Sequence, residues 1–475
     1  MFRQQELWRA VDRHAATAIA LSDAVWDCPE VAYDEWRSAD LHAALLERRG
    51  FRVTRGIAGI PTALVGEAGA EGPVVAILGE YDALPGLSQE AGTAERKPLS
   101  GCDAGHGCGH NLLGAGSLLA AVALKDWLAG SGTPGRVRYY GCPAEEGGAA
   151  KTYMVRAGAF ADADIAISWH PAPYDGVNDA QSLANTRIDF TFTGRASHAA
   201  AAPHLGRSAL DAVELMSVGV NYLREHMPSS ARVHYAYLDA GGVAPNVVQA
   251  RAAVRYLIRT REGQELAPLA ARVRACAEGA ALMTDTIFAS AVYSAVSNLL
   301  PNPPLEEAMF RNFRRLGPAP WDEADRAFAE AIRSTFSAED IASTFRRAGR
   351  PVDAGLPLWG EAVPLDAKGA PMMGSTDVGD VSWVVPTVQA RGATCAIGTP
   401  GHSWQLTAQG KSPLAHKGMV HTAKVMAATA MDAFLDPDLV ARAKAAHAER
   451  TRLTPYVCPL PADKRPPVRP RPTGR

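Results

Sequence analysis

The run PVVAILGE, residues 73–80, decides the fold of this chain, because it is apolar along almost its whole length and ends in a glutamate. A strand buried on both faces of a parallel sheet has this composition, whereas a strand with one wet face alternates apolar and polar residues. Helical and strand-like stretches alternate around it, with helices expected at 4–26, 35–49, 111–129 and 149–157 and strands at 59–67, 136–142 and 163–169. This alternation predicts an α/β domain with a mostly parallel sheet.

The pattern changes at about residue 184. Residues 187–194 alternate with a period of two, and the order strand, helix, strand, strand, helix, strand then continues to residue 293. This order is the split βαβ arrangement of ferredoxin-like folds. We therefore expect a first α/β part at 1–183, an inserted ferredoxin-like α+β domain at 184–298, a second α/β part at 299–450 and a Pro/Arg-rich tail at 451–475.

The second α/β part contains less regular sequence than the first. An insertion is expected at about 318–370, with one helical stretch at 321–336. The α/β character returns with a strand at 393–399, ATCAIGT, and a helix at 416–436. The tail beyond residue 451 has the composition of an extended or disordered segment.

The charge balance excludes several classes of protein. The 48 Lys and Arg residues against 50 Asp and Glu give a net charge of −2, so we expect neither nucleic acid nor a membrane as a partner. No run approaches the ~20 apolar residues of a membrane span. The first helix carries Glu6, Asp12 and Arg13, unlike a secretory signal. Seven cysteines in a chain of 475 residues make no disulfide framework and predict a reduced, cytoplasmic protein.

Residues that can bind metals collect where the predicted parallel strands end. Open α/β sheets place their active sites at the carboxyl ends of their strands. A cysteine, histidines and glutamates at several strand ends together make a set that suits a transition metal. The residues concerned are Glu80 and Asp82 after 73–80, Cys108 and His110 in GHGCGHN, Glu145 and Glu146 after 136–142, His170 after 163–169 and His402 after 393–399.

The chemistry of hydrolysis explains why these residue types occur together. A divalent metal lowers the pKa of its water towards ~7, and a free carboxylate can then accept the proton. One glutamate of the Glu145–Glu146 pair can bind metal while the other acts as the base, and the residues alone leave this assignment open. Asp82 can hold a ligand histidine through its second ring nitrogen.

Eight motifs resemble the amidohydrolase branch of the aminoacylase/carboxypeptidase-G metallopeptidases. They are GEYDALPG (79–86), GHGCGHN (105–111), CPAEEGG (142–148), SWHP (168–171), GRASHAAAAPHLGRSALDA (194–212), GGVAPNVVQA (241–250), GSTDVGDVSW (374–383) and GTPGHSWQ (398–405). The resemblance implies a catalytic α/β domain interrupted by a lid or dimerisation domain, with two divalent ions, manganese or zinc, in each chain. It implies Glu145 as the general base. The metal ligands that it implies are Cys108, His110, Glu146, His170 and His402.

The resemblance also assigns residues of the inserted domain. His198 matches a histidine that reaches the active site of a partner subunit and polarises the scissile carbonyl, although it could equally cap its own turn. Asn246 matches a substrate-contacting asparagine, with turn formation as the alternative. Arg207 could pair with a substrate carboxylate or remain solvated. The family often has Asp at position 80, so we leave Glu80 out of the ligand set.

The function implied by the resemblance is hydrolysis of the amide bond of an N-acyl or N-aroyl amino acid. The small-molecule substrate expected first is p-aminobenzoyl-glutamate or an analogue. Alternatives are an indoleacetyl-amino acid, a peptide, an aromatic amine released by a related hydrolase, or a regulatory role within a heteromer. The partner chain is expected to be a second copy or a related subunit.

Overall fold

Two sheets organise the chain, whose computed structural model describes residues 2–177, 182–367, 369–370 and 373–471. The larger sheet has seven strands in the order β1-β2-β4-β3-β5-β11-β6. The central pairs β4–β3, β3–β5 and β5–β11 are parallel, and the outer pairs are antiparallel. This arrangement confirms the predicted α/β class. The strands are β1 (Arg52–Arg55), β2 (Leu64–Gly69), β3 (Val74–Glu80), β4 (Arg136–Cys142), β5 (Ile165–Ala172), β6 (Gly176–Val177) and β11 (Thr387–Ala393).

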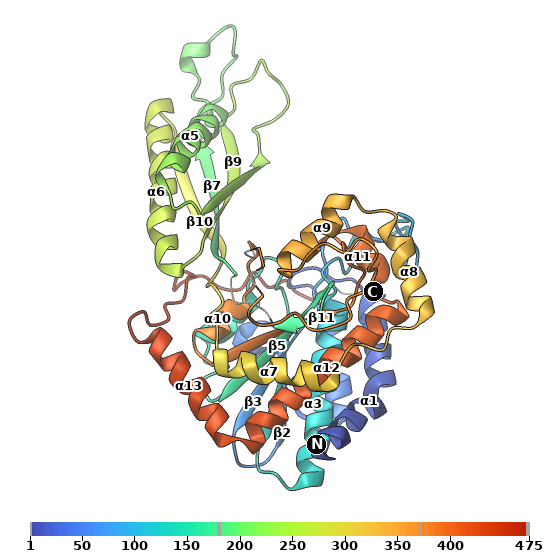
Figure 1. Cartoon of the computed structure of the whole chain (residues 1–475). Coiled ribbons are helices and arrows are strands. Elements are labelled where there is room, and N and C mark those ends of the chain that lie inside the picture. Colours follow the sequence, from blue (N-terminus) through green and yellow to red (C-terminus); the bar gives the residue numbers. More distant parts are fainter. Residues whose placement is uncertain (1, 178–181, 368, 371–372, 472–475) are drawn as a thin grey trace.

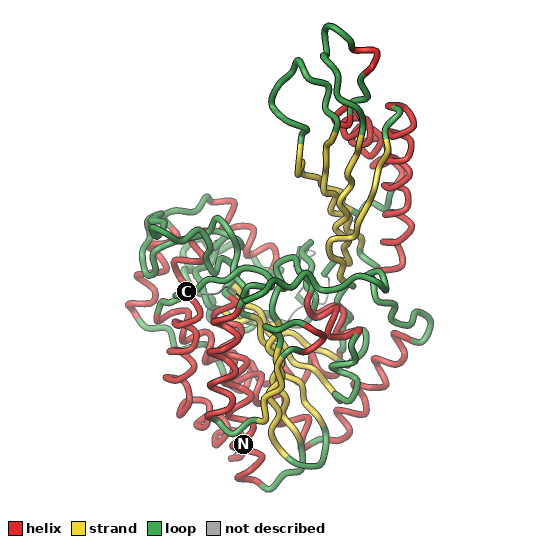
Figure 2. The backbone as a smooth tube through the Cα atoms, turned by 180° about the vertical axis from the view of Figure 1, so that it is seen from behind, coloured by secondary structure: helices red, strands yellow, loops and turns green. Residues whose placement is uncertain are grey.

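Helices cover both faces of the large sheet, and the central strand shows why. Val75 and Ile77 of β3 belong to one apolar core, whereas Ala76 and Leu78 belong to another on the opposite face. Because successive residues of a strand point to opposite faces, a wholly apolar strand can serve both cores. Figures 1 and 2 show the surrounding helices: α1 (Phe2–Trp26), α3 (His110–Ser131) and α12 (Pro413–Leu435) pack in the first core, and α4 (Ala150–Arg156) and α10 (Val378–Ser382) pack in the second.

Helix α3 corrects one expectation. By length and composition it is apolar enough to cross a membrane, although the sequence was expected to contain no such run. Its most apolar window is 83% buried inside the protein. The composition of α3 therefore matches a central core helix, which is the role predicted for residues 111–129.

The smaller sheet has the strand order β10-β7-β9-β8, and each neighbouring pair is antiparallel. The order of elements along the chain is the predicted split βαβ order. Ile188, Phe190 and Phe192 of β7 face α5 and α6 in a core of their own. Figure 1 shows this lobe, which we call the lid, standing away from the larger one. Its elements are β7 (Ala184–Thr193), α5 (Ala209–Leu223), β8 (Arg232–Asp239), β9 (Arg251–Thr260), α6 (Gly263–Thr284) and β10 (Ile287–Val296).

The segment after the lid is more helical than its sequence indicated. Two helices, α8 and α9, follow one another where a single helical stretch was expected at 321–336. Both begin with a capping box, built on Asp322 and Ser337, which satisfies the free N–H groups of a short helix. The remaining helices are α2 (Trp36–Arg48), η1 (Ile57–Gly59), η2 (Pro203–Leu205), η3 (Arg224–His226), α7 (Pro303–Leu316), α8 (Glu323–Arg333), α9 (Ala338–Arg347), α11 (Trp404–Gln409) and α13 (Pro437–Thr451).

The strand predicted at 393–399 is wrong in position. The strand is β11, Thr387–Ala393, and the apolar residues after it leave the sheet. The amide of Ile397 donates to the carbonyl of Pro357, and its side chain packs with Phe345 and Trp359 of the 318–370 segment. An apolar run thus marks burial here without marking a strand.

The described part of the C-terminal tail is an extended arm against the larger lobe. Leu460 is buried in the core that also contains Leu78. The hydroxyl of Tyr456 donates to Asp380 at 2.9 Å. Residues 472–475 of the predicted tail lie outside the described residues.

Candidate metal centre

The glycine loop at 105–111 brings Cys108 and His110 to the carboxyl end of the sheet. A side chain on Gly105 would place its Cβ 2.0 Å from the carbonyl oxygen of Leu87, so only glycine allows this close approach. Gly109 has a φ of +75° and precedes α3, which begins at His110. The loop can therefore bend sharply and present Cys108 and His110 on one side, towards the ends of β3, β4 and β5.

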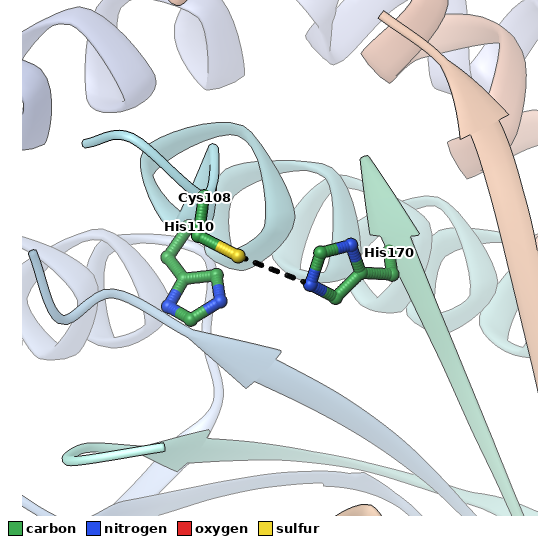
Figure 3. A group of neighbouring side chains, drawn as sticks. All are labelled: Cys108, His110 and His170. Atoms are coloured by element: carbon green, nitrogen blue, oxygen red, sulfur yellow. Dashed lines mark hydrogen bonds between the residues drawn. The ribbon is translucent and has the colours of Figure 1, made fainter. Parts of the chain in front are cut away.

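The cysteine and two histidines form the first part of the centre. The Sγ of Cys108 lies 3.4 Å from Nε2 of His170, and the rings of His110 and His170 meet edge to face at 5.8 Å (Figure 3). Burial raises the pKa of the Cys108 thiol, and burial lowers the pKa of His170 well below its usual value. Burial thus favours a neutral His170, the form in which an imidazole binds a metal.

Donor atoms gather in three groups whose atoms lie within 4.8 Å of one another. One group is Cys108, His110 and His170, and a second is Cys108, Glu146 and His402. Cys108 belongs to both, so its sulfur occupies the position of a bridge between two cations. The donor set fits transition metals, and the buried Nε2 of His110 and Oε1 of Glu146 have no hydrogen-bond partner in the protein. The third group is Glu80, His110 and Glu145.

Asp82 orients the centre, as its place after β3 suggested. Its Oδ1 accepts a hydrogen bond from Nδ1 of His110 at 2.9 Å, which directs the other ring nitrogen towards Cys108. Its Oδ2 accepts from the backbone N–H of Glu146 at 2.8 Å. Although burial disfavours an imidazolium, the neighbouring Cys108 and Asp82 raise the pKa of His110 well above its usual value. The surroundings of this ring therefore attract positive charge.

The two glutamates stand on a turn that sequence reasoning did not explain. Ala144 has a φ of +56°, and its N–H donates to Oε1 of the buried Glu35 at 2.9 Å. This unusual backbone conformation sends Glu145 and Glu146 in different directions, so that Glu146 lies with His402, 3.3 Å from its Nε2. Burial, Glu80 and Glu146 together raise the pKa of Glu145 well above its usual value. A base with a raised pKa accepts a proton more readily than an ordinary carboxylate.

The loop of His402 is attached to the glycine loop. The backbone N–H of His402 donates to the carbonyl of Gly107 at 2.9 Å, and its own φ is +55°. Its hydrogen bond to Glu146 raises the pKa of His402. The imidazole is half exposed, so this side of the centre opens to solvent.

The three predicted lid residues lie away from this centre. His198 and Asn246 sit together in adjoining loops beyond the far end of β7, where the N–H of Ala199 donates to the carbonyl of Asn246. Ten strand residues at ~3.3 Å each separate these loops from the base of the lid by ~33 Å. Nδ1 of His198 accepts from two backbone N–H groups of its own turn. Arg207 donates to Asp285 at 2.7 Å.

A cavity of about 1170 Å³ opens beside the centre. The base of the lid sheet contributes Arg187 and Arg259 to its wall, two residues that the sequence did not single out. Arg187 lies against Gly147, where a Cβ would meet its guanidinium at 1.9 Å. Arg259 donates to the carbonyl of Met373 and the hydroxyl of Ser375, both uncharged.

The charge of these two arginines is poorly compensated. No carboxylate of the described residues forms an ion pair with either guanidinium. Burial lowers the pKa of Arg187, and burial together with Arg187 lowers that of Arg259. The cavity wall opposite the glutamates is therefore suited to an anion.

Comparisons with known proteins agree with this site. Residues 76–455 match the peptidase family M20/M25/M40. The chain is 45% identical to one of the two subunits named for the p-aminobenzoyl-glutamate hydrolase of Escherichia coli, over 97% of this chain and 99% of the relative. It is 30% identical to Xaa-Arg dipeptidase of Mus musculus, over 90% and 88% of the two chains. A solved Bacillus subtilis structure, described as a dinuclear metal-binding peptidase of the M20 family, shares the fold with a TM-score of 0.53 at 16% identity, covering 86% of this chain and 99% of that one.

Proposed function

This chain belongs to peptidase family M20/M25/M40 and is a hydrolase of carbon–nitrogen bonds, and from that premise we propose that it cleaves p-aminobenzoyl-glutamate to p-aminobenzoate and glutamate. The observation that carries the substrate class is the position of Arg187 and Arg259 beside the metal-binding residues. A glutamyl leaving group has two carboxylates, and guanidinium groups bind carboxylates through paired, charge-assisted hydrogen bonds. An amide next to these arginines would lie over Glu145.

We assign two divalent ions, manganese or zinc, to the two groups that share Cys108. When bound, the metals supply a water of lowered pKa and polarise the scissile carbonyl. Glu146, in one group with Cys108 and His402, would be a ligand. Glu145, outside both Cys108 groups, would accept the proton of the attacking water and return it to the leaving amine. Asp82 would hold the tautomer of His110 that presents Nε2 to the metal.

A second chain would complete the site. The Escherichia coli hydrolase has two differently named subunits, and this chain is similar to each, which supports a partner that is either a related subunit or a second copy. His198, which cannot reach the centre of its own chain, would reach that of the partner. The edge strand β8 supports the lid as the contact surface, because its Tyr235, Tyr237 and Leu238 are exposed.

Product analysis tests the substrate assignment. The protein, loaded with manganese or zinc, is incubated separately with p-aminobenzoyl-glutamate, p-aminobenzoyl-alanine and a dipeptide ending in arginine, and the products are separated by chromatography. A charge-assisted hydrogen bond is worth ~1.5–3 kcal/mol, so we expect the glutamate amide to react ~10–100-fold faster than the alanine amide. Faster cleavage of the arginine dipeptide would refute the assignment, because two cationic residues in the wall should repel that substrate.

Mixing two inactive variants tests the partner. Glu145→Gln removes the base and His198→Ala removes the lid histidine, so each protein alone should be nearly inactive. If His198 acts across an interface, mixed assemblies contain one site with both residues, and activity returns. A mixture as inactive as its components, with subunit exchange verified by mass spectrometry, would contradict a role across the interface.

A further inference from the structure

A lysine is buried directly behind the metal centre. Lys151, in α4, has no solvent exposure, and its Nζ donates to Oε1 of Glu80 and to Oδ1 of Asp377 at 2.6 Å each. Its backbone N–H donates to Oδ2 of Asp377 at 2.9 Å. The three residues come from the end of β3, from α4 and from the residue before α10. The ion triad thus joins three elements that meet at the centre.

The two carboxylates of the triad differ in one respect. Both oxygens of Asp377 accept hydrogen bonds from Lys151. Glu80 uses only Oε1, whereas its Oε2 is buried and makes no hydrogen bond. A buried carboxylate oxygen without a partner is costly, so its position calls for a ligand. Lys151 therefore holds Glu80 with one oxygen unused.

The unused oxygen points to His110. Oε2 of Glu80 lies 3.3 Å from Nε2 of His110, which also makes no hydrogen bond. Since Nδ1 of His110 donates its proton to Asp82, Nε2 carries a lone pair in the neutral ring. Two lone pairs that face each other repel, unless a cation lies between or beside them. Glu80 and His110 also share a donor group with Glu145 within 4.8 Å.

We propose that Glu80 is a further ligand of the metal bound by His110, and that Lys151 is the positioning residue that holds it. The proposal rests on the metal-dependent function above. Lys151 occupies one oxygen, so Glu80 would bind through Oε2 alone. A carboxylate added to thiolate and imidazole donors makes the site harder and favours Mn²⁺ relative to Zn²⁺. The chain's own residues thus indicate manganese at this position.

Two matched variants test the proposal through metal binding. Glu80→Gln and Asp377→Asn each remove one negative charge from the triad, leave Lys151 one carboxylate partner and keep the side-chain shape. Loss of a ligand or its immediate support commonly weakens metal binding 10–100-fold. We expect Glu80→Gln to weaken Mn²⁺ binding ~10–100-fold, with a smaller effect on Zn²⁺, and Asp377→Asn to change either by less than ~3-fold. Calorimetric titration of the metal-free proteins measures both.

The possible results separate this proposal from the function on which it rests. A wild-type protein that binds neither metal would refute the metal-dependent function itself. A wild-type protein that binds metal no more tightly than Glu80→Gln would refute only the role of Glu80. Equal losses in both variants would show that the triad supports the fold alone, and would overturn the ligand assignment. If Glu80→Gln does not fold, a crystal structure of the Mn²⁺-loaded wild type decides: Oε2 within ~2.2 Å of the metal supports the proposal, and a separation beyond contact overturns it.

Discussion

Replacing Asp82 by Asn should weaken metal binding without removing any metal ligand. The buried Asp82 carboxylate accepts from Nδ1 of His110 at 2.9 Å and from the N–H of Glu146 at 2.8 Å. An asparagine has a single acceptor oxygen and can satisfy only one of the two donors. Its NH₂ group would face either the N–H of Glu146 or the ring of His110.

The structure gives the size of the effect. A hydrogen bond to a charged acceptor contributes ~1.5–3 kcal/mol, so the apoprotein should lose about that much free energy of unfolding. If the NH₂ group faces His110, the ring changes tautomer and turns an N–H towards Cys108 in place of the lone pair. Loss of such an orienting partner weakens metal binding ~10–100-fold, or ~1.4–2.7 kcal/mol.

Asp380→Asn provides the matched control. Asp380 is also a buried carboxylate, which accepts from the N–H and hydroxyl of Ser297 and from Tyr456, but it belongs to none of the donor groups. Urea unfolding of the apoproteins should show similar losses for both variants, and calorimetric titration with Mn²⁺ should show weaker binding for Asp82→Asn alone. Wild-type affinity in Asp82→Asn would refute the orienting role, and equal weakening in Asp380→Asn would attribute the effect to general loss of stability.

Three further predictions address the base, the cavity and the core. Glu145→Gln should keep wild-type metal content while turnover falls by ~10²–10⁴, and metal analysis beside steady-state kinetics checks this. Arg187→Gln should raise KM for p-aminobenzoyl-glutamate ~10-fold with little change for the alanine analogue, whereas Arg255→Gln, whose guanidinium is neutralised by Asp189 on the same sheet, should leave KM unchanged. Burial lowers the pKa of His42 to about 3, so below its unfolded value of ~6.5 the unfolded chain takes up a proton that the folded protein excludes. Acidification from pH 7 to 5 should therefore remove about 2 kcal/mol of stability from the wild type but not from His42→Gln, and urea midpoints that keep a constant gap over this range would contradict it.

The residues that gather at the centre were accessible to sequence reasoning because of one geometric rule. In a parallel sheet, the carboxyl ends of the strands share one edge, so polar residues after successive strands must approach one another. This rule placed Glu146 and His170 near Cys108 without any knowledge of packing. It also placed His402 correctly, although the strand was assigned to residues 393–399 and lies at 387–393.

The supporting residues followed no such rule. Lys151 is separated from Asp377 by 226 residues, and a lysine in a short helix has the sequence signature of a solvated position. The buried Glu35 reaches Ala144 across 109 residues. Arg187 and Arg259 occupy the polar positions of alternating strands, which normally face water. Their burial depends on how the base of the lid meets the larger lobe, and a sequence pattern contains no information on that contact.

The charges around the centre explain why these hidden residues matter. The net charge of the whole chain is only −2, yet several carboxylates are buried within reach of His110. Burial and mutual repulsion raise the pKa of Glu145, while the adjacent thiol and carboxylate, against the effect of burial, raise the pKa of His110. Both shifts are the same response, the uptake of protons where positive charge is lacking. A divalent cation supplies that charge and must displace those protons, so metal binding here is coupled to proton release and strengthens as the pH rises.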